Sequence, residues 1–261
     1  MDNKSFNLNK KRILLIGATG VLGATYAKAL KEEGCRLVIF DHPETNINDF
    51  AKELGVKGIE LDLLSESNVV KAIEEAFSIL GGFDGVINNA AATGELMLKK
   101  GDAFSPFEDY PLELWMHGMN VNLTGTFLIC REAGKYMKSH GGSIINMSST
   151  YGFLAPDHRI YKNQKFKSMP SYSASKAGVL GLTKWLSTWW AEDNIRVNSV
   201  SPGGVFNDHD DEFVSAYSKR TPMNRMANRE ELIGMILFLL SDLSSYCTGQ
   251  NYIVDGGYSA W

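Results

Sequence analysis

The stretch Arg12–Gly23 constrains the fold of this chain more than any other. It opens with the apolar run Ile13–Ile16, which is too short for a helix and suits a strand buried on both faces of a parallel sheet. A helix is predicted over Ala24–Glu33, and three glycines separate it from the strand: Gly17, Gly20 and Gly23. Glycines allow a tight turn and a close approach to a pyrophosphate, and the start of a helix offers unpaired N–H groups to it. The stretch therefore predicts a dinucleotide-binding turn.

A second apolar run, Arg36–Phe40, ends at Asp41. Its distance from the glycines is close to the roughly 20 residues at which an acidic side chain binds the adenosine ribose of a dinucleotide. Because a carboxylate accepts hydrogen bonds from both ribose hydroxyls and repels a 2′-phosphate, Asp41 predicts NAD as the preferred cofactor over NADP. Positive charge close to Asp41 would favour NADP instead, and Lys11, Arg12 and His42 are the candidates for it.

Predicted strands and helices alternate along the chain, which is typical of an α/β fold with a parallel sheet. We expect one doubly wound Rossmann-type domain over residues 1–261, with about seven strands and helices on both faces of the sheet. A polar tail is expected at 1–11. The further strands are expected at Gly58–Leu61, Gly85–Ile87, Ser143–Met147, Ile195–Val200 and Tyr252–Val254. The further helices are expected at Ile47–Leu54, Asn68–Leu80, Leu112–His140, Ser171–Glu192 and Arg229–Leu240.

Composition limits the partners of the chain. A formal charge of −4 without a basic patch indicates that neither nucleic acid nor a membrane surface is a partner. No apolar run approaches the roughly 18 residues of a membrane span, and the first residues lack the apolar core of a secretion signal. The three cysteines lie far apart in apolar surroundings, as buried thiols of a reducing compartment do, so we expect a cytoplasmic protein. The His and Cys residues show no metal-ligand spacing, and no metal is expected.

Ligands of such sheets bind at the carboxyl ends of the strands, so chemistry is expected from polar residues near that edge. Tyr172 and Lys176 lie one turn apart on a predicted helix and share a face. A Lys ammonium beside a phenol lowers the pKa of the phenol, and such a Tyr can exchange a proton with a substrate oxygen. Tyr161 and Lys165 have the same spacing, but their segment is polar and rich in lysine, and we interpret it as a solvated loop.

A series of short motifs occurs in order along the chain. They are G-A-T-G-V-L-G, N-N-A-A, N-V-N-L-T-G, S-I-I-N-M-S-S, Y-S-A-S-K, I-R-V-N-S-V-S-P-G-G and V-D-G-G. Each motif alone is weak, but the set in this order is specific. From about Arg12 to Trp261 the chain resembles the short-chain dehydrogenase/reductase family.

The resemblance implies four catalytic residues. Tyr172 would be the general acid/base, and Lys176 would bind the nicotinamide ribose and lower the pKa of Tyr172. Ser149 would hydrogen-bond the substrate oxygen, and its place in the motif selects it over Ser148. Asn122 would hold a water that relays protons, although N-L-T-G also fits a simple helix kink.

The resemblance also implies contacts to the cofactor beyond Asp41. At the pyrophosphate it places Gly17, Thr19, Gly20, Leu22 and Gly23. At the adenine it places Asp62 and Leu63, at the ribose Asn89, Ala90 and Ala91, and beside the nicotinamide Pro202, Gly203 and Val205.

The chain departs from the family pattern in three places. Gly20 lies one position earlier than the usual middle glycine, a form that resembles the extended branch of the family, which acts largely on nucleotide sugars. The segment between Ser149 and Tyr172 is longer than usual, and we expect its extra residues, 154–170, to form a polar and basic loop beside the substrate. The Thr that usually follows Pro202-Gly203 is absent, which removes one contact to the nicotinamide carboxamide from the pattern.

These observations predict an NAD(P)-dependent oxidoreductase that interconverts a secondary alcohol and a ketone on a small-molecule substrate. His158, Arg159 and the lysines of the 154–170 loop favour a polar, sugar-like and even anionic substrate. Similar chains with a Pro-Asp loop after the Ser are often sugar-modifying dehydrogenases of bacterial surface-glycan pathways. Two alternatives stay open: a non-redox sugar-nucleotide epimerase or dehydratase that holds NAD tightly, and a catalytically silent NAD-binding regulatory protein.

The two longest predicted helices carry more apolar residues than one sheet-facing stripe requires. The excess is largest in Leu182–Trp190, which holds three tryptophans. A large apolar surface is a liability on a monomer, so we expect a homodimer or a homotetramer. The alternative is that the Trp side chains only face their own core.

Overall fold

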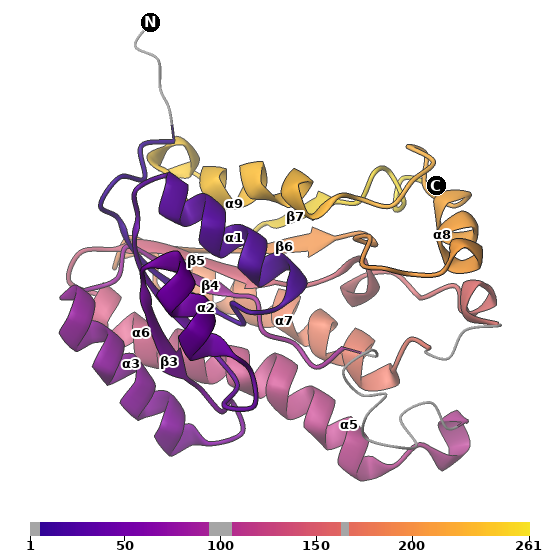
Figure 1. The fold of residues 1–261 in the computed structure, drawn as a ribbon, viewed down its shortest axis with the longest axis horizontal. Coiled ribbons are helices and arrows are strands. Elements are labelled where there is room, and N and C mark those ends of the chain that lie inside the picture. The colour runs from indigo at the N-terminus through magenta and orange to yellow at the C-terminus, as the bar shows by residue number, and fades with distance from the viewer. Residues whose placement is uncertain (1–5, 94–105, 163–166) are drawn as a thin grey trace, which may run out of the picture.

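The computed structural model describes residues 6–93, 106–162 and 167–261. One sheet of seven parallel strands has the order β3-β2-β1-β4-β5-β6-β7 (Figure 1). This confirms the expected doubly wound α/β fold. The strands are β1 (Arg12–Ile16), β2 (Arg36–Asp41), β3 (Lys57–Glu60), β4 (Gly85–Asn88), β5 (Gly142–Met147), β6 (Ile195–Pro202) and β7 (Asn251–Val254).

Helices cover both faces of the sheet, and each face has its own apolar core. Residues of one face pack with α1 (Val21–Glu32), α2 (Ile47–Leu54) and α9 (Ile233–Leu240). Residues of the other face pack with α3 (Glu66–Leu80), α6 (Gly125–Met137) and α7 (Pro170–Trp189).

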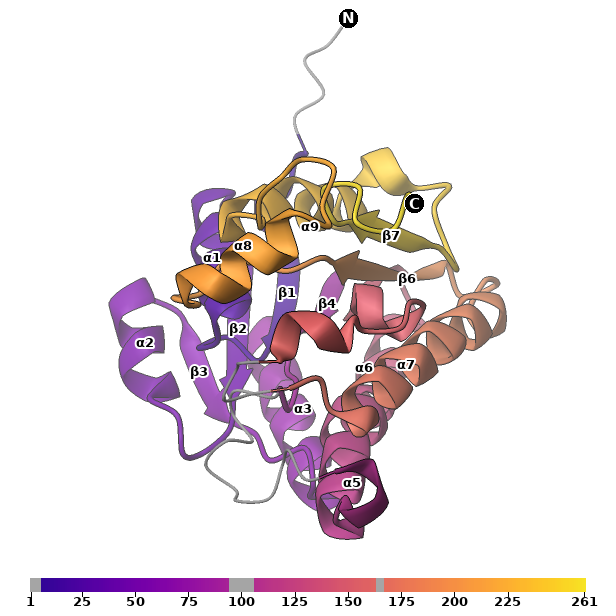
Figure 2. The same ribbon diagram turned by 90° about the vertical axis from the view of Figure 1, so that its right-hand side faces the viewer.

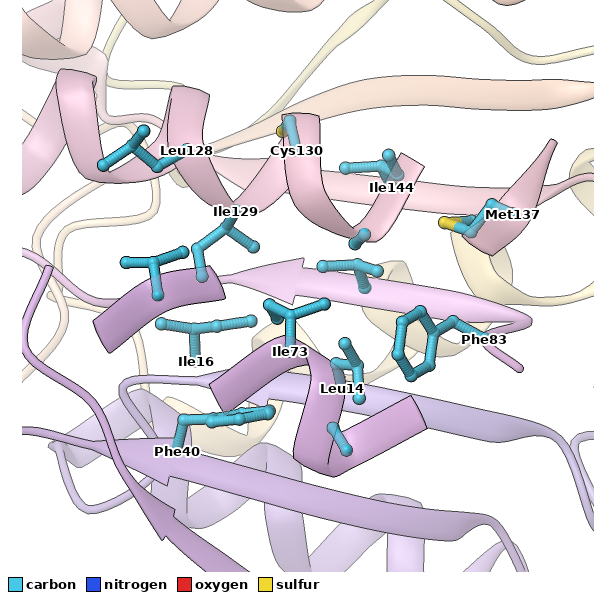
Figure 3. Packing of buried hydrophobic residues seen from close by; sticks show 14 of the residues in the cluster. Leu14, Ile16, Phe40, Ile73, Phe83, Leu128, Ile129, Cys130, Met137 and Ile144 are labelled. Atoms are coloured by element: carbon cyan, nitrogen blue, oxygen red, sulfur yellow. The ribbon is translucent and has the colours of Figure 1, made fainter. Parts of the chain in front are cut away.

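The first strand shows why its sequence is apolar throughout. Leu14 and Ile16 belong to the core beneath α3 and α6, which Figure 3 shows, whereas Ile13 and Leu15 belong to the core beneath α1. Side chains alternate between the faces of a strand, so a strand covered on both sides needs an apolar residue at every position.

The predicted helix Leu112–His140 is interrupted in the structure. It consists of α5 (Leu112–Met119), a π-helical segment (Asn120–Thr124) and α6, which ends at Met137. A π-helical turn holds one residue more than an α-helical turn and is frequent at functional sites.

Some elements differ from the expected ones. The helix α8 (Asp211–Ser218) was not expected, and Figure 2 shows it at the carboxyl edge of the sheet. Helix α1 begins at Val21 rather than Ala24. Within the expected polar tail, Leu8 is fully buried, and the Lys10 N–H donates to the Gly34 carbonyl at 2.8 Å. In the described part of the chain, no helix combines the length and the apolar character that crossing a membrane requires.

Candidate active site

A carboxylate at the end of β2 holds the turn between β1 and α1. Asp41 Oδ2 accepts hydrogen bonds from the backbone N–H and the hydroxyl of Thr19, both at 2.7 Å. The other oxygen, Oδ1, accepts from the His42 N–H at 2.8 Å. Asp41 therefore has a fixed orientation beside the glycine turn, where the adenosine ribose is predicted.

Close packing requires glycine at two positions of this turn. Gly17 has a φ of 80°, and a Cβ built on it would lie 2.6 Å from the Ala90 Cα. A Cβ on Gly23 would lie 1.9 Å from the Gly17 carbonyl oxygen. That oxygen accepts a hydrogen bond from Asn89 Nδ2 at 2.8 Å. The residues that follow β4 thus support the turn, and Ala91 comes next to them in the chain.

The third glycine leaves the turn open. Gly20 precedes α1, and a Cβ on it would meet nothing closer than the Gly17 oxygen at 3.8 Å. The Gly20 position supplies no side-chain cap to the first turn of α1. Since the first N–H groups of a helix have no partner within the helix, they can bind an anion. The turn therefore fits the pyrophosphate of a dinucleotide, while the nearby Leu22 packs against the core.

The residues predicted at the adenine follow β3. The Asp62 N–H donates to Asn68 Oδ1 at 2.8 Å, and the Asp62 carboxylate accepts from the Leu64 N–H at 2.9 Å. Leu63 is partly buried, and a Cβ on Gly125 would lie 3.0 Å from its own Cβ. This corner is therefore ordered by its own hydrogen bonds.

The residues predicted beside the nicotinamide follow from the end of β6. Pro202 is its last residue, and the Gly203 N–H donates to the Val254 carbonyl at 2.9 Å. Val205 forms an isolated parallel bridge with Ala227. The carboxyl ends of β1, β2, β4, β5 and β6 thus lie along the same edge of the sheet as the glycine turn.

Two of the cations suspected near Asp41 lie elsewhere. Arg12 begins β1, and its guanidinium binds Asp84 at 2.6 Å. Lys11 Nζ lies 2.7 Å from Asp242 Oδ1. Since both precede β1, they lie at the amino ends of the strands, the opposite edge from Asp41, and only His42 stays beside it. The expectation that Lys11 or Arg12 could lie close to Asp41 was wrong.

Ser149 and Tyr172 come together at the end of β5. Burial raises the pKa of Tyr172, and the side chain of Ser149 acts against that rise. The two side chains are therefore close enough to interact. The neighbouring Ser148 is buried and donates to the Lys176 carbonyl at 2.9 Å. Of the two serines, Ser149 is therefore the one whose hydroxyl reaches Tyr172.

Lys176 is buried behind Tyr172. Its Nζ donates to the Met147 carbonyl at 2.7 Å and lies 5.7 Å from the centroid of the Tyr172 ring. Burial lowers the pKa of Lys176 to about 8. Lys176 is thus placed against the ring of Tyr172, and Ser149 is the group that opposes the rise in the Tyr172 pKa caused by burial.

Asn122 lies in the π-helical segment with its side chain fully buried. Its Oδ1 accepts from the Ala92 N–H at 2.6 Å, and its Nδ2 donates to the Ala92 carbonyl at 3.3 Å. Nδ2 also lies 3.1 Å from Ser175 Oγ, on α7. Asn122 therefore joins the segment after β4 to the helix that carries Tyr172.

The interpretation of Tyr161 as part of a solvated loop was wrong. Tyr161 is buried in a 3-10 turn, His158–Tyr161, and its hydroxyl lies 2.9 Å from the hydroxyl of Tyr151. Its ring lies 5.5 Å from that of Phe213, on α8. Polar composition concealed this contact, because the apolar partner belongs to a helix far along the chain. Lys165 lies outside the described residues.

An aromatic cluster that the sequence does not predict lies beside Ser149. It contains Tyr217 and Tyr258, whose rings stack at 5.0 Å, and Tyr217 accepts a hydrogen bond from the Gly204 N–H. Figure 2 shows α8 beside the segment that follows β5. The Tyr151 N–H donates to Ser149 Oγ at 3.2 Å, which connects the cluster to the site. Its only sequence signal was Tyr151, two positions after Ser149.

The basic character expected of the 154–170 loop is partly neutralised. Arg159 Nε binds Asp157 Oδ1 at 2.8 Å, and Arg220 binds the other oxygen of the same carboxylate. The Arg159 hydrogen bond holds the pKa of Asp157 well below its usual range. Among residues 6–93, 106–162 and 167–261, no three His, Cys, Asp or Glu side chains group closely enough to hold a metal ion.

Comparison with known proteins agrees with this geometry. The family model described as enoyl-(acyl carrier protein) reductase matches residues 17–259. A 3-oxoacyl-[acyl-carrier-protein] reductase of Aquifex aeolicus is 33% identical over 96% of this chain and 98% of its own. An NAD-dependent glycerol dehydrogenase of Listeria innocua is 30% identical over 98% of this chain and 97% of its own.

Solved structures are also similar to this one. A short-chain dehydrogenase from Leptospira borgpetersenii, with bound NAD+, superposes with a TM-score of 0.87 at 31% identity. The match covers 99% of this chain and 97% of the other.

Proposed function

The chain belongs to the short-chain dehydrogenase/reductase family, and on this premise we propose that it oxidises a polar, sugar-like secondary alcohol, or reduces the matching ketone, with Tyr172 as general acid/base. The members of this family are NAD(P)-dependent enzymes that act on CH–OH groups. The observation that carries the proposal is the interaction between the side chains of Ser149 and Tyr172 at the carboxyl end of β5.

Each catalytic role rests on one contact. Ser149 would hold the substrate oxygen next to the Tyr172 hydroxyl, because the two groups already meet there. Tyr172 would take up or give back the proton of that oxygen. Lys176, fixed by the Met147 carbonyl, would bind the nicotinamide ribose and bring positive charge to the back of the phenol. The nicotinamide, when bound, supplies or accepts the hydride.

The proposed role of Asn122 is positional as well as catalytic. Its amide fixes Ala92 on one side and Ser175 on the other, so it aligns the segment after β4 with α7. A water bound next to this amide would connect Lys176 to solvent and replace the proton that Tyr172 gives up.

The proposed cofactor is NAD rather than NADP. The support is Asp41, whose carboxylate is held at the edge of the glycine turn by Thr19 and His42. A 2′-phosphate next to this carboxylate would be repelled, and the cations that would compensate, Lys11 and Arg12, are paired at the other edge of the sheet.

A screen of alcohols, followed by NADH absorbance, tests the proposal. Polyols and sugar derivatives should give NADH with the wild-type protein, and Tyr172→Phe should abolish the signal without loss of NAD binding. Wild-type protein that binds NAD but oxidises no alcohol and reduces no ketone would overturn it.

A second function is favoured by the position of Gly20, which resembles that of nucleotide-sugar enzymes. A non-redox epimerase or dehydratase would keep NAD through purification and convert a sugar nucleotide without net NADH. Chromatography of sugar nucleotides after incubation with the protein distinguishes this function from net oxidation. A protein without catalysis would do neither.

A further inference from the structure

We propose that the hydroxyls of Tyr151, Tyr161 and Tyr258 form a subsite that binds a second substrate hydroxyl, next to the carbon that Tyr172 serves. The substrate class is then a polyol with adjacent hydroxyl groups. This inference rests on the proposed function and specifies its substrate. Three separate parts of the chain bring the three tyrosines together: the turn after β5, the 154–170 loop and the C-terminal segment.

The subsite is continuous with the candidate catalytic serine. Tyr151 donates its backbone N–H to Ser149 Oγ at 3.2 Å, so its position is tied to the group that meets Tyr172. The Tyr151 side chain extends from there to the Tyr161 hydroxyl at 2.9 Å. A substrate whose reacting oxygen lies at Ser149 and Tyr172 therefore has the tyrosine pair as its neighbour.

Tyr258 has a hydroxyl without a partner. The Tyr258 hydroxyl is buried, and it forms no hydrogen bond with any group in the described part of the chain. Its ring is fixed, because it stacks on Tyr217 and lies 5.5 Å beneath the Arg220 guanidinium. Buried polar groups are nearly always hydrogen-bonded, so an unpaired one in a fixed ring indicates a site for a ligand hydroxyl or a water.

The tyrosines of the subsite lie in one aromatic cluster. Tyr161 and Tyr258 are buried in it, Tyr151 packs against it, and Tyr258 stacks on Tyr217 at 5.0 Å. Burial raises the pKa of Tyr161 to about 12 and also raises the pKa of Tyr151. At neutral pH both are therefore uncharged phenols that can donate and accept a hydrogen bond.

The polar groups of the cluster fit a polyol. Arg159 and Arg220 share the carboxylate of Asp157, so both guanidiniums are engaged in ion pairs. Phenols match alcohol hydroxyls, which also donate and accept. A site that hydrogen-bonds a substrate hydroxyl strongly rejects the analogue that lacks it, because its own polar groups are then left unpaired.

The test uses two alcohols that differ by one hydroxyl, butane-2,3-diol and butan-2-ol. With the wild-type protein and NAD, kcat/KM should be at least ten times higher for the diol. Tyr161→Phe should lower the ratio of the two kcat/KM values about tenfold, mainly through KM for the diol. Tyr151→Phe should act in the same direction, and Tyr246→Phe, at a fully exposed tyrosine far along the chain, is the matched control.

The outcomes separate this inference from the proposed function. Equal kcat/KM for the two alcohols in the wild-type protein, or an equal loss for both in Tyr161→Phe, overturns the subsite while oxidation itself persists. No NADH from any alcohol overturns the proposed function as well. Thermal melting of each variant, with and without NAD, shows whether the fold is kept. If a variant does not fold, the ratio of kcat/KM for the diol and the mono-alcohol in the wild-type protein alone tests the subsite.

Discussion

The side chains of Ser149 and Tyr172 interact across the inserted segment 154–170, so the longer spacing leaves the pair together. In the described part of that segment, the 3-10 turn His158–Tyr161 packs against α8, where Tyr161 meets Phe213. The insertion thus contributes Tyr161 to the aromatic cluster beside Ser149 without separating the pair.

Removal of the Tyr172 hydroxyl should stop turnover. Tyr172→Phe keeps the ring that packs with Met169 and Leu114 but loses the group that exchanges the proton. We expect kcat to fall by at least about 100-fold with an unchanged Kd for NAD. Steady-state kinetics and NAD titration measure the two quantities. Tyr246→Phe is the control, and an equal loss in both variants would contradict the assignment.

The charge of Asp41 should set the cofactor preference. With wild-type protein, kcat/KM should be at least about tenfold higher with NAD than with NADP, since a carboxylate next to a phosphate costs free energy. Asp41→Asn removes the charge and should narrow that ratio. Because the Thr19 contacts also depend on Asp41, a thermal melt should accompany the kinetics. A wild-type preference for NADP would mean that His42 outweighs Asp41.

Burial of Lys176 should make stability depend on alkaline pH. Its pKa is about 8 in the folded protein and 10.5 in an unfolded chain, so between these values the unfolded state binds more protons. The free energy of unfolding therefore carries a penalty below about pH 8 that is relieved as the pH rises towards 10.5, by about 3 kcal/mol in all.

Lys176→Met, which cannot titrate, should lack this rise. Urea unfolding gives the free energy of unfolding of the ligand-free wild type and variant at pH 7 and at pH 10. The difference between wild type and variant is compared at the two pH values, so that the titration of other groups cancels. A difference between variant and wild type that is the same at both pH values would show that Lys176 keeps an ordinary pKa.

The tryptophans of α7 divide between the core and the surface. Trp190 is buried against the sheet-facing core, whereas Trp185 and Trp189 are 57% and 62% exposed and stack at 5.1 Å. We expect this exposed pair to lie in a two-fold interface between subunits. Sedimentation of the wild-type protein should give two or four times the chain mass of 28.9 kDa.

Glutamate at both positions, Trp185→Glu with Trp189→Glu, should shift the protein toward the monomer. Ile79→Glu, on α3, alters another exposed apolar residue and should leave the assembly intact. A wild-type protein that sediments as a single 28.9 kDa species would contradict the expected oligomer.

Local patterns were sufficient to predict the sheet. Each strand was recognised as a short apolar run followed by a polar residue or a glycine. In β1 the reason is burial on both faces of the sheet, since every position after Arg12 is buried and must be apolar. The glycine turn was equally visible as a local motif. Gly23 is required by its contact with Gly17 nearby in the chain, whereas Gly17 is also required by Ala90, which no local pattern shows.

The aromatic cluster beside Ser149 could not be predicted from the same local patterns. Tyr161 follows charged residues and precedes lysines, and its burial depends on Phe213 and Tyr151, which come from other segments. Helix α8 is short, with acidic residues in its first turn and buried Phe213 and Tyr217 one turn apart. Such contacts exist only once the fold has brought distant segments together.

The π-helical segment at Asn120–Thr124 has a consequence for the tolerance of this chain to changes in length. Each residue of an α-helix advances the helix by about 100°, and the wide turn accommodates one residue more than a regular turn. That offset lets α5 direct Leu114 toward Met169 while α6 directs Ile129 toward the sheet. Loss of a single residue between 120 and 124 would restore a uniform helix and rotate one of these faces away from its partner. Apart from Asn122, whose buried amide binds Ala92 and Ser175, this short stretch should therefore accept substitutions far more readily than deletions.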